Sequence, residues 1–122
     1  MTPRRVLQLC VVLTAAKLLT ACSGPIETHP SSSPDGSITL RVEIDEGGGA
    51  AVADVTSVFL IPTSASGTSK TLIFKGSAMS NFSAKWRDNQ TVELSYTAGY
   101  VSKCDSEPTL DKRRTLRVHG CS

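Results

Sequence analysis

The segment ITLRVEID, residues 38–45, alternates apolar and polar side chains with a period of two. Because successive side chains of a β-strand point to opposite faces of a sheet, this alternation predicts a strand with one buried face. Five further strands are predicted from short apolar or alternating runs bounded by turn-forming residues. They cover residues 51–61, 71–75, 82–86, 92–96 and 114–119. No window after residue 21 has a convincing helical period.

These runs predict an all-β domain over residues 38–122, a small and mostly antiparallel β-sandwich or curled sheet of about six strands. Connections this short can join antiparallel strands but cannot form parallel crossovers. All six aromatic residues lie between Phe59 and Tyr100. We therefore expect the core in that stretch, with Trp86 as its largest member.

The first 21 residues are predicted to be a signal peptide and not part of the fold. Arg4 and Arg5 precede the apolar stretch of residues 6–16, in the order of a charged n-region and an h-region. A transmembrane helix needs about 20 apolar residues, and this stretch is shorter.

Residues 19–22, Leu-Thr-Ala-Cys, resemble the lipobox of bacterial lipoproteins. The resemblance implies cleavage before Cys22, a diacylglycerol thioether on its sulfur and usually acylation of the new amine with a chain such as palmitate. Two or three acyl chains anchor stably, since each buried CH₂ contributes about 0.8 kcal/mol. The alternative is ordinary cleavage after Ala16, which would release a soluble protein with an unpaired Cys22.

The segment after Cys22 is rich in Ser and Pro, so residues 22–37 are predicted to be a lipidated cysteine and a flexible tether. The full chain has 13 Lys and Arg against 11 Asp and Glu. Removal of residues 1–21 removes Arg4, Arg5 and Lys17 and no acid, which leaves 10 against 11, a net charge of −1. This balance does not favour a nucleic-acid partner.

Cys104 and Cys121 remain after the signal and the anchor are assigned. In an exported protein such a pair favours a disulfide, which here would contribute roughly 3 kcal/mol by closing the chain between them. Free thiols are one alternative. A metal site that adds His119 is the other, but it lacks a fourth ligand and matches no common zinc spacing, so no metal is expected.

Two turn motifs stand before strands: Ser33-Pro34-Asp35-Gly36, and Trp86-Arg87-Asp88-Asn89 before residues 92–96. Each alone resembles the turn-strand units of β-propeller blades, but the chain is too short for four blades. Between them come an acidic-to-Gly/Ala break at residues 45–51 and a strand through residues 58–61. This combined order over residues 33–101 is similar to a family of small bacterial lipoproteins whose domain has no assigned function. That resemblance implies the fold class and export, and no activity.

A second resemblance concerns residues 64–76. The element Ser64-Ala65-Ser66-Gly67, followed by Lys75-Gly76, is similar to the inhibitory loops of membrane-bound c-type lysozyme inhibitors. In that family a Ser and a Lys meet the carboxylates of the lysozyme cleft, which implies these roles for Ser66 and Lys75. This chain departs from the family in its cysteine arrangement and in the Thr68-Ser69-Lys70 run, where the family has a Tyr.

Other combinations favour structural roles. A serine nucleophile needs a base, and the histidines, His29 and His119, lie in the predicted tether and beside the predicted disulfide. Asp45, Glu46 and Asp54 flank a Gly-rich turn and indicate a solvated loop more than a Ca²⁺ site. The basic run of residues 112–114 favours a charged strand entrance over a lipid headgroup contact.

The sequence therefore predicts a non-enzymatic binding or structural module of the cell envelope. Cys22 would anchor it to the cell membrane or outer membrane, with the domain outside the cytoplasm and an envelope protein as a candidate partner. No cofactor is expected. The alternative is a protein inhibitor of a secreted hydrolase that acts through residues 64–76.

Overall fold

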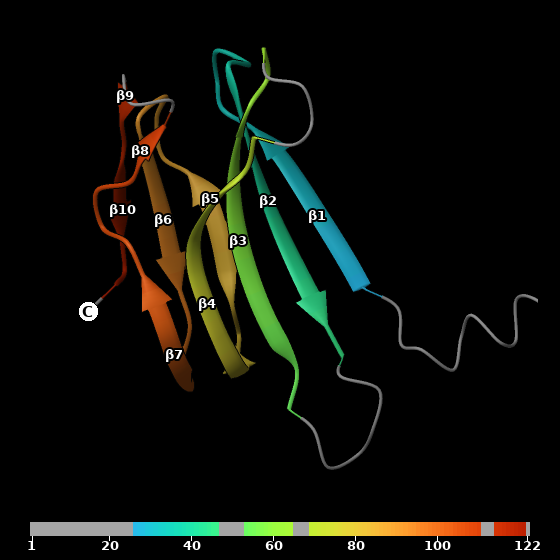
Figure 1. Cartoon of the computed structure of the whole chain (residues 1–122). Coiled ribbons are helices and arrows are strands. Elements are labelled where there is room, and N and C mark those ends of the chain that lie inside the picture. Colours follow the sequence, from blue (N-terminus) through green and yellow to red (C-terminus); the bar gives the residue numbers. More distant parts are fainter. Residues whose placement is uncertain (1–25, 47–52, 65–68, 111–113, 122) are drawn as a thin grey trace, which may run out of the picture.

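The computed structural model describes residues 26–46, 53–64, 69–110 and 114–121 (Figure 1). Within these ranges the chain forms ten strands and no helix. The strands are β1 (Ile26–Ser32), β2 (Ile38–Asp45), β3 (Val55–Pro62), β4 (Thr71–Ser80), β5 (Ser83–Trp86), β6 (Thr91–Ser95), β7 (Ala98–Cys104), β8 (Thr109–Leu110), β9 (Arg114–Thr115) and β10 (Arg117–His119).

The strands form a five-stranded sheet in the order β1-β2-β3-β4-β7, a three-stranded sheet in the order β10-β6-β5, and the β8-β9 pair. Every pair is antiparallel except β10 with β6. Parallel strands cannot be joined by a short connection, and β6 and β10 are separated by a long segment of the chain. The predicted all-β, mostly antiparallel class is confirmed.

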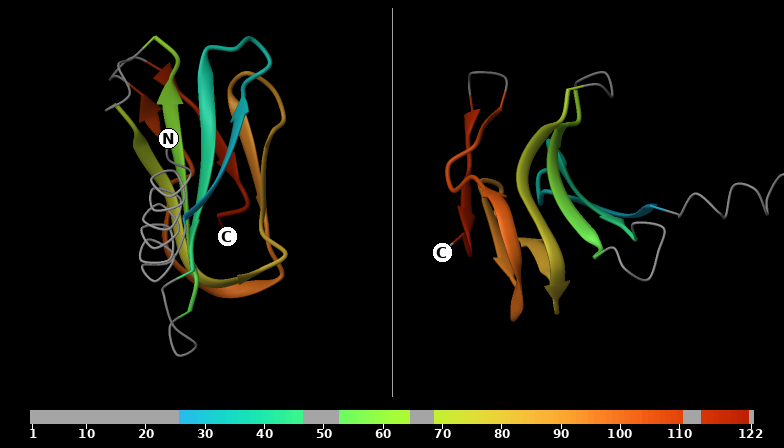
Figure 2. Two further views of the ribbon diagram at one scale, coloured as in Figure 1. Left: turned by 90° about the vertical axis from the view of Figure 1, so that its right-hand side faces the viewer. Right: turned by 60° about the horizontal axis from the view of Figure 1, so that its bottom comes forward.

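The two larger sheets face each other in two layers and enclose the core (Figure 2). The alternation in β2 turns Ile38, Leu40 and Val42 inward, and β3 contributes Val58 and Leu60 from the same face. The rest of the buried apolar core consists of Ile73, Phe74, Val92, Leu94, Leu110, Leu116 and Val118. Each such side chain stabilises the fold by about 1.5–3 kcal/mol through removal of apolar surface from water.

The sequence predicted Trp86 as the largest member of the core, and this prediction is wrong: Trp86 does not lie in the centre of the core. The largest fully buried side chain is Phe74, whose ring centroid lies 5.1 Å from that of Phe82 and 5.9 Å from that of Tyr96. Trp86 is half-buried at the margin, and Tyr100 is 78% exposed. Tyr100 is exposed because it lies on β7, an edge strand of the five-stranded sheet. The composition of the sequence does not show which strand is at the edge.

The structure also corrects the predicted tether of residues 22–37. Ile26–Ser32 form β1, which pairs with β2 from Ile26↔Asp45 to Ser32↔Thr39. All seven residues of β1 are exposed. Backbone hydrogen bonds to β2 hold this strand, and such bonds leave no hydrophobic pattern in the sequence. The sheet thus includes residues 26–32, which the sequence assigned to the tether.

One link closes each side of the sandwich. On one side Trp86 Nε1, on the outer strand β5, donates to the carbonyl oxygen of Ser31 on the outer strand β1 at 3.0 Å. On the other side a disulfide joins Cys104, the last residue of the outer strand β7, to Cys121, which follows the outer strand β10. The outer strands of the two sheets are therefore tied together at both margins.

Candidate functional site

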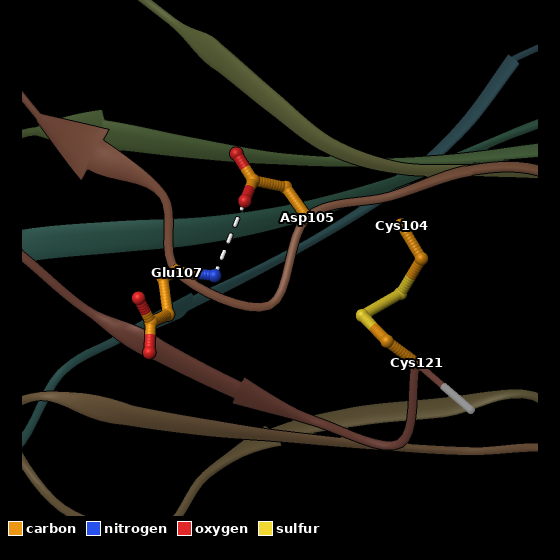
Figure 3. Close-up of a disulfide and its surroundings, with 4 residues drawn as sticks. All are labelled: Cys104, Asp105, Glu107 and Cys121. Carbon is orange, nitrogen blue, oxygen red and sulfur yellow. Dashed lines mark hydrogen bonds between the residues drawn. A yellow bond between two sulfur atoms is a disulfide. The ribbon is translucent and has the colours of Figure 1, made fainter.

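The disulfide defines the first component of the site. Cys104 and Cys121 are bonded with an S–S distance of 2.02 Å, which confirms the predicted pairing (Figure 3). It closes the segment of residues 104–121, called here the closed loop. His119 is exposed, and in the described ranges no group of three or more His, Cys, Asp or Glu side chains could hold a metal ion.

Backbone hydrogen bonds fold the closed loop on itself. Val118 donates its N–H to the carbonyl oxygen of Ser106 at 2.9 Å, and Leu116 donates to Pro108 at 2.9 Å. These two bonds place Glu107 opposite Arg117. The bonds lie on either side of this pair, and the backbones of Glu107 and Arg117 form no hydrogen bond with each other. Opposite residues of this kind project their side chains on the same face at close range.

Two further contacts fix the position of Glu107 and Arg117. The N–H of Glu107 donates to Oδ1 of Asp105 at 3.1 Å, as Figure 3 shows. On the other side of β10, the N–H of Arg117 donates to the carbonyl oxygen of Gln90 at 2.8 Å. The closed loop is thus attached to the turn that joins β5 to β6.

The β5–β6 turn is the second component of the site. Oδ1 of Asp88 accepts the N–H of Gln90 at 2.8 Å, and the N–H of Arg87 donates to the carbonyl oxygen of Thr91 at 2.9 Å. The bond from Gln90, followed by a hydrogen bond from the Thr91 hydroxyl, lowers the pKa of Asp88 below its ordinary value of 3.8. Asp88 therefore stays ionised at neutral pH.

The β1–β2 turn supports the β5–β6 turn from behind. Oδ1 of Asp35 accepts hydrogen bonds from the N–H and hydroxyl of Ser37, at 3.0 and 2.8 Å, and from the hydroxyl of Ser33 at 2.8 Å. These bonds lower the pKa of Asp35, the backbone bond from Ser37 most of all. The N–H of Asp35 donates to Oδ1 of Asn89 at 2.8 Å, so the two turn motifs of the sequence contact each other.

A pocket of about 690 Å³ opens between the β5–β6 turn and the closed loop. We call it the turn–loop pocket. It is lined by Asp88, Asn89, Gln90, Thr91, Glu107, Thr115 and Arg117. Its size is that of a small-molecule site, but every residue that lines it has a polar or charged side chain.

The polar groups of the turn–loop pocket divide into two kinds. Asp88 and Asn89 each use an oxygen inside the turns. Glu107 and Arg117 are exposed, and neither forms an ion pair with another described residue. A carboxylate that accepts and a guanidinium that donates in a planar fork are therefore free to contact a ligand.

A second pocket of about 450 Å³ lies beside the β1–β2 turn. Its lining is Ser37, Ile38, Pro62, Thr63, Ser64, Leu110 and Arg114. Arg114 is not free there, since its Nη1 donates to the hydroxyl of Ser37 at 2.9 Å. This member of the predicted basic run therefore supports a turn, and residues 112 and 113 lie outside the described residues.

The residues predicted for an inhibitory or anchoring role do not meet in one place. Cys22 and Ser66 lie outside the described residues. Lys75 is exposed on β4, opposite Lys103 on β7 and Ser57 on β3. His29 lies on β1, where its Nε2 is 3.6 Å from Oε2 of Glu27.

Sequence reasoning missed Glu107, Thr115 and Arg117 as site residues. The predicted disulfide indicated that residues 104–121 form a closed segment. Nothing in the sequence indicated that its two arms would pair with Glu107 opposite Arg117, or that this pair would dock beside Gln90. The turn motif of residues 86–89 was recognised, but only as a turn.

Comparison with models of known protein families, with curated proteins and with solved structures finds no match for this chain. In the described part of the chain there is no helix with the length and apolarity to cross a bilayer.

Proposed function

We propose that this chain is a lipid-anchored, non-enzymatic binding module of the bacterial cell envelope, and that the turn–loop pocket is its binding site. The observation that carries the binding role is the free pair of Glu107 and Arg117 on the wall of an open polar pocket. Charge-assisted hydrogen bonds to such groups give both affinity and orientation.

Two features of the pocket favour binding over catalysis. General acids and bases need pKa values near the operating pH, which usually requires burial or a close like charge. The pKa of Asp88 is shifted the opposite way, so this carboxylate is a permanent acceptor at neutral pH. The remaining charged groups are exposed to solvent.

The place of β1 supports the anchored arrangement. Ile26, which begins β1, is the fourth residue after Cys22 in sequence, and an extended chain spans at most about 3.6 Å per residue. The start of β1 would then lie within about 15 Å of the acylated cysteine. The strand leads to the β1–β2 turn, which contacts Asn89 of the pocket. Figure 1 shows the start of β1 and the β1–β2 turn at opposite ends of this strand. The pocket would thus lie at the end of the domain away from the bilayer.

The anchor is tested by the intact mass of detergent-extracted protein. We expect a chain that starts at Cys22 and carries acyl chains. Cys22→Ala should move the protein to the soluble exported fraction or leave it unprocessed, because it removes the acceptor sulfur, whereas Cys10→Ala should change neither mass nor location. A mature chain that begins at Lys17 without lipid would refute the anchor.

The binding role is tested by co-sedimentation of the extracted protein with insoluble envelope material. We expect Arg117→Gln to reduce the bound fraction and Lys85→Gln, which removes an exposed cation on β5, to leave it unchanged. If both variants bind as the wild type does, the turn–loop pocket is not the binding site.

A second candidate is an inhibitor of a secreted hydrolase such as lysozyme. It is favoured by Lys75 and Lys103, which lie opposite each other on β4 and β7 and have no acidic partner among the described residues. A cleft with two catalytic carboxylates would complement this pair of cations. Micromolar protein should slow lysozyme turnover, and Lys75→Ala should abolish the effect. Untouched turnover excludes this candidate.

A further inference from the structure

The wall of the turn–loop pocket presents opposite charges side by side. Glu107 lies between Ser106 and Pro108, which accept hydrogen bonds from the two neighbours of Arg117, and both Glu107 and Arg117 line the pocket. They nevertheless form no ion pair with each other. The disulfide and the backbone bonds on either side hold the two positions together.

Such a wall complements a molecule that carries the reverse pair of charges. We infer that the turn–loop pocket binds a small zwitterion, an amino acid or a short peptide with both termini free. The ligand carboxylate pairs with the Arg117 guanidinium, and the ligand ammonium pairs with the Glu107 carboxylate. This inference deepens the proposed function and rests on the assignment of the pocket as the binding site.

The geometry of each charged group suits its assigned partner. The guanidinium of Arg117 offers two parallel N–H donors to one carboxylate, which is the strongest arrangement for a planar anion. A carboxylate such as that of Glu107 accepts from the three N–H donors of an ammonium group. An exposed direct pair between Glu107 and Arg117 would contribute little to stability, so a ligand has little to displace.

The opposite wall completes the selection for a zwitterion. Oδ1 of Asn89 is occupied by the N–H of Asp35, which leaves the amide nitrogen as a donor for a peptide carbonyl. Asp88 stays ionised beside it. With Asp88, Glu107 and Arg117 the pocket has two negative groups and one positive group, so a purely anionic ligand is disfavoured.

The test is a calorimetric titration of the detergent-extracted protein at neutral pH with three probes. These are dialanine, dialanine with an acetylated amine, and dialanine with an amidated carboxylate. Each capped probe loses one of the two charges and keeps the side chains. We expect dialanine to bind and either cap to weaken binding by about tenfold or more, the usual effect of losing a hydrogen bond between charged groups.

Matched variants locate the binding. Glu107→Gln and Arg117→Gln should each weaken dialanine binding by about tenfold, and Arg117→Lys should restore part of it by keeping the charge. Glu27→Gln and Lys85→Gln, which remove the same charges elsewhere on the surface, should have no effect. A thermal unfolding curve for each variant separates lost binding from lost folding.

Three outcomes would overturn the inference: no saturable binding of dialanine at millimolar concentration, equal binding of the capped probes, or full affinity in both pocket variants. Its failure is distinguishable from failure of the proposed function. Envelope co-sedimentation that depends on Arg117, without dialanine binding, would refute only the zwitterion. Dialanine binding by a chain that is neither acylated nor retained by envelope material would refute the envelope role alone.

Discussion

At the scale of single residues, two aspartates act as hydrogen-bond acceptors inside turns, and this makes stability depend on pH. The pKa of Asp35 and of Asp88 is lower in the folded chain than the ordinary 3.8, mainly through the N–H groups of Ser37 and Gln90. A carboxylate with a depressed folded pKa binds its proton more readily in the unfolded chain. Its stabilising contribution is therefore complete above the unfolded pKa and is lost as pH falls through the folded pKa.

We expect the wild-type protein to lose stability steadily from about pH 4 downward, and the double variant Asp35→Asn/Asp88→Asn to lose less. Asparagine keeps an acceptor oxygen in each turn but does not titrate in this range. Urea unfolding midpoints between neutral and acidic pH measure the difference. Asp54→Asn is the control, because Asp54 lies outside both turns. An identical pH dependence for the double variant and the wild type would contradict the assignment.

Gly120 is the other residue that decides local geometry. Its φ of +104° lies in a region that favours glycine, and a Cβ there would collide with the carbonyl oxygen of Leu94. Gly120 also precedes Cys121, so any displacement reaches the disulfide. The sequence contains Gly120 next to a cysteine, but it does not reveal that Leu94 lies against it.

Gly120→Ala should destabilise the fold by about 2–4 kcal/mol, since backbone strain and a collision add. Gly36→Ala is a matched comparison, because Gly36 also has a positive φ, +74°, but has no atom within 4 Å of the added Cβ. Its cost should be only the conformational penalty of about 1–2 kcal/mol. Urea unfolding under oxidising conditions measures both. Equal costs would mean that the contact with Leu94 is unimportant.

At the scale of elements, β1 shows how an edge strand can be held with no buried side chain. Its support is the ladder with β2 and the bond from Trp86 Nε1 to the carbonyl oxygen of Ser31. Pro30 lies within the strand and has no N–H, which is tolerated at the edge of a sheet and limits pairing with other chains.

Hydrogen exchange measured by NMR distinguishes this strand from a flexible tether. We expect alternate amides of residues 26–32 to be protected by bonds to β2. Trp86→Phe should speed their exchange, because it removes one hydrogen bond of about 0.5–1.5 kcal/mol. The amides of β3, in the middle of the sheet, provide the control in the same spectra. If every amide of β1 exchanges as in an unfolded chain, the strand is not formed in solution.

The elements that could be predicted from the sequence are those with one buried face. β2 follows the period-two pattern of residues 38–45 closely, and β3, β5 and β6 lie within or beside their predicted runs. β1 and β7 were missed because nearly all of their residues are exposed, so no alternation marks them. The disulfide was predicted by counting cysteines. Glu107 and Arg117 could not be predicted as site residues, because their position opposite each other depends on contacts between distant segments.

At the scale of the whole molecule, the two margins of the sandwich have different roles. The disulfide margin positions the closed loop that forms one wall of the turn–loop pocket. The opposite margin holds β1, which enters the domain next to the proposed anchor and leads to the turn that supports the other wall. Anchor and pocket are thus connected through one strand, at its two ends.

This arrangement predicts which end of the domain lies near the bilayer. Ile26 is 58% exposed at the start of β1, and the single tryptophan, Trp86, contacts Ser31 near the end of that strand. The separation of Ile26 and Ser31 along the strand is about 17 Å at 3.3 Å per residue. A tryptophan at residue 26 should therefore report the bilayer, and Trp86 should not.

We expect brominated lipids to quench the fluorescence of Ile26→Trp in a Trp86→Phe background, when the acylated protein is reconstituted in vesicles. The emission of the wild-type Trp86 should change little, because bromine quenches only at short range. Adding Cys22→Ala to the Ile26→Trp variant is the control and should abolish the quenching. Stronger quenching of Trp86 than of Trp at residue 26 would place the turn–loop pocket against the membrane. An envelope ligand could then not reach Glu107 and Arg117, so this result would refute both the orientation and the binding role assigned to that pocket.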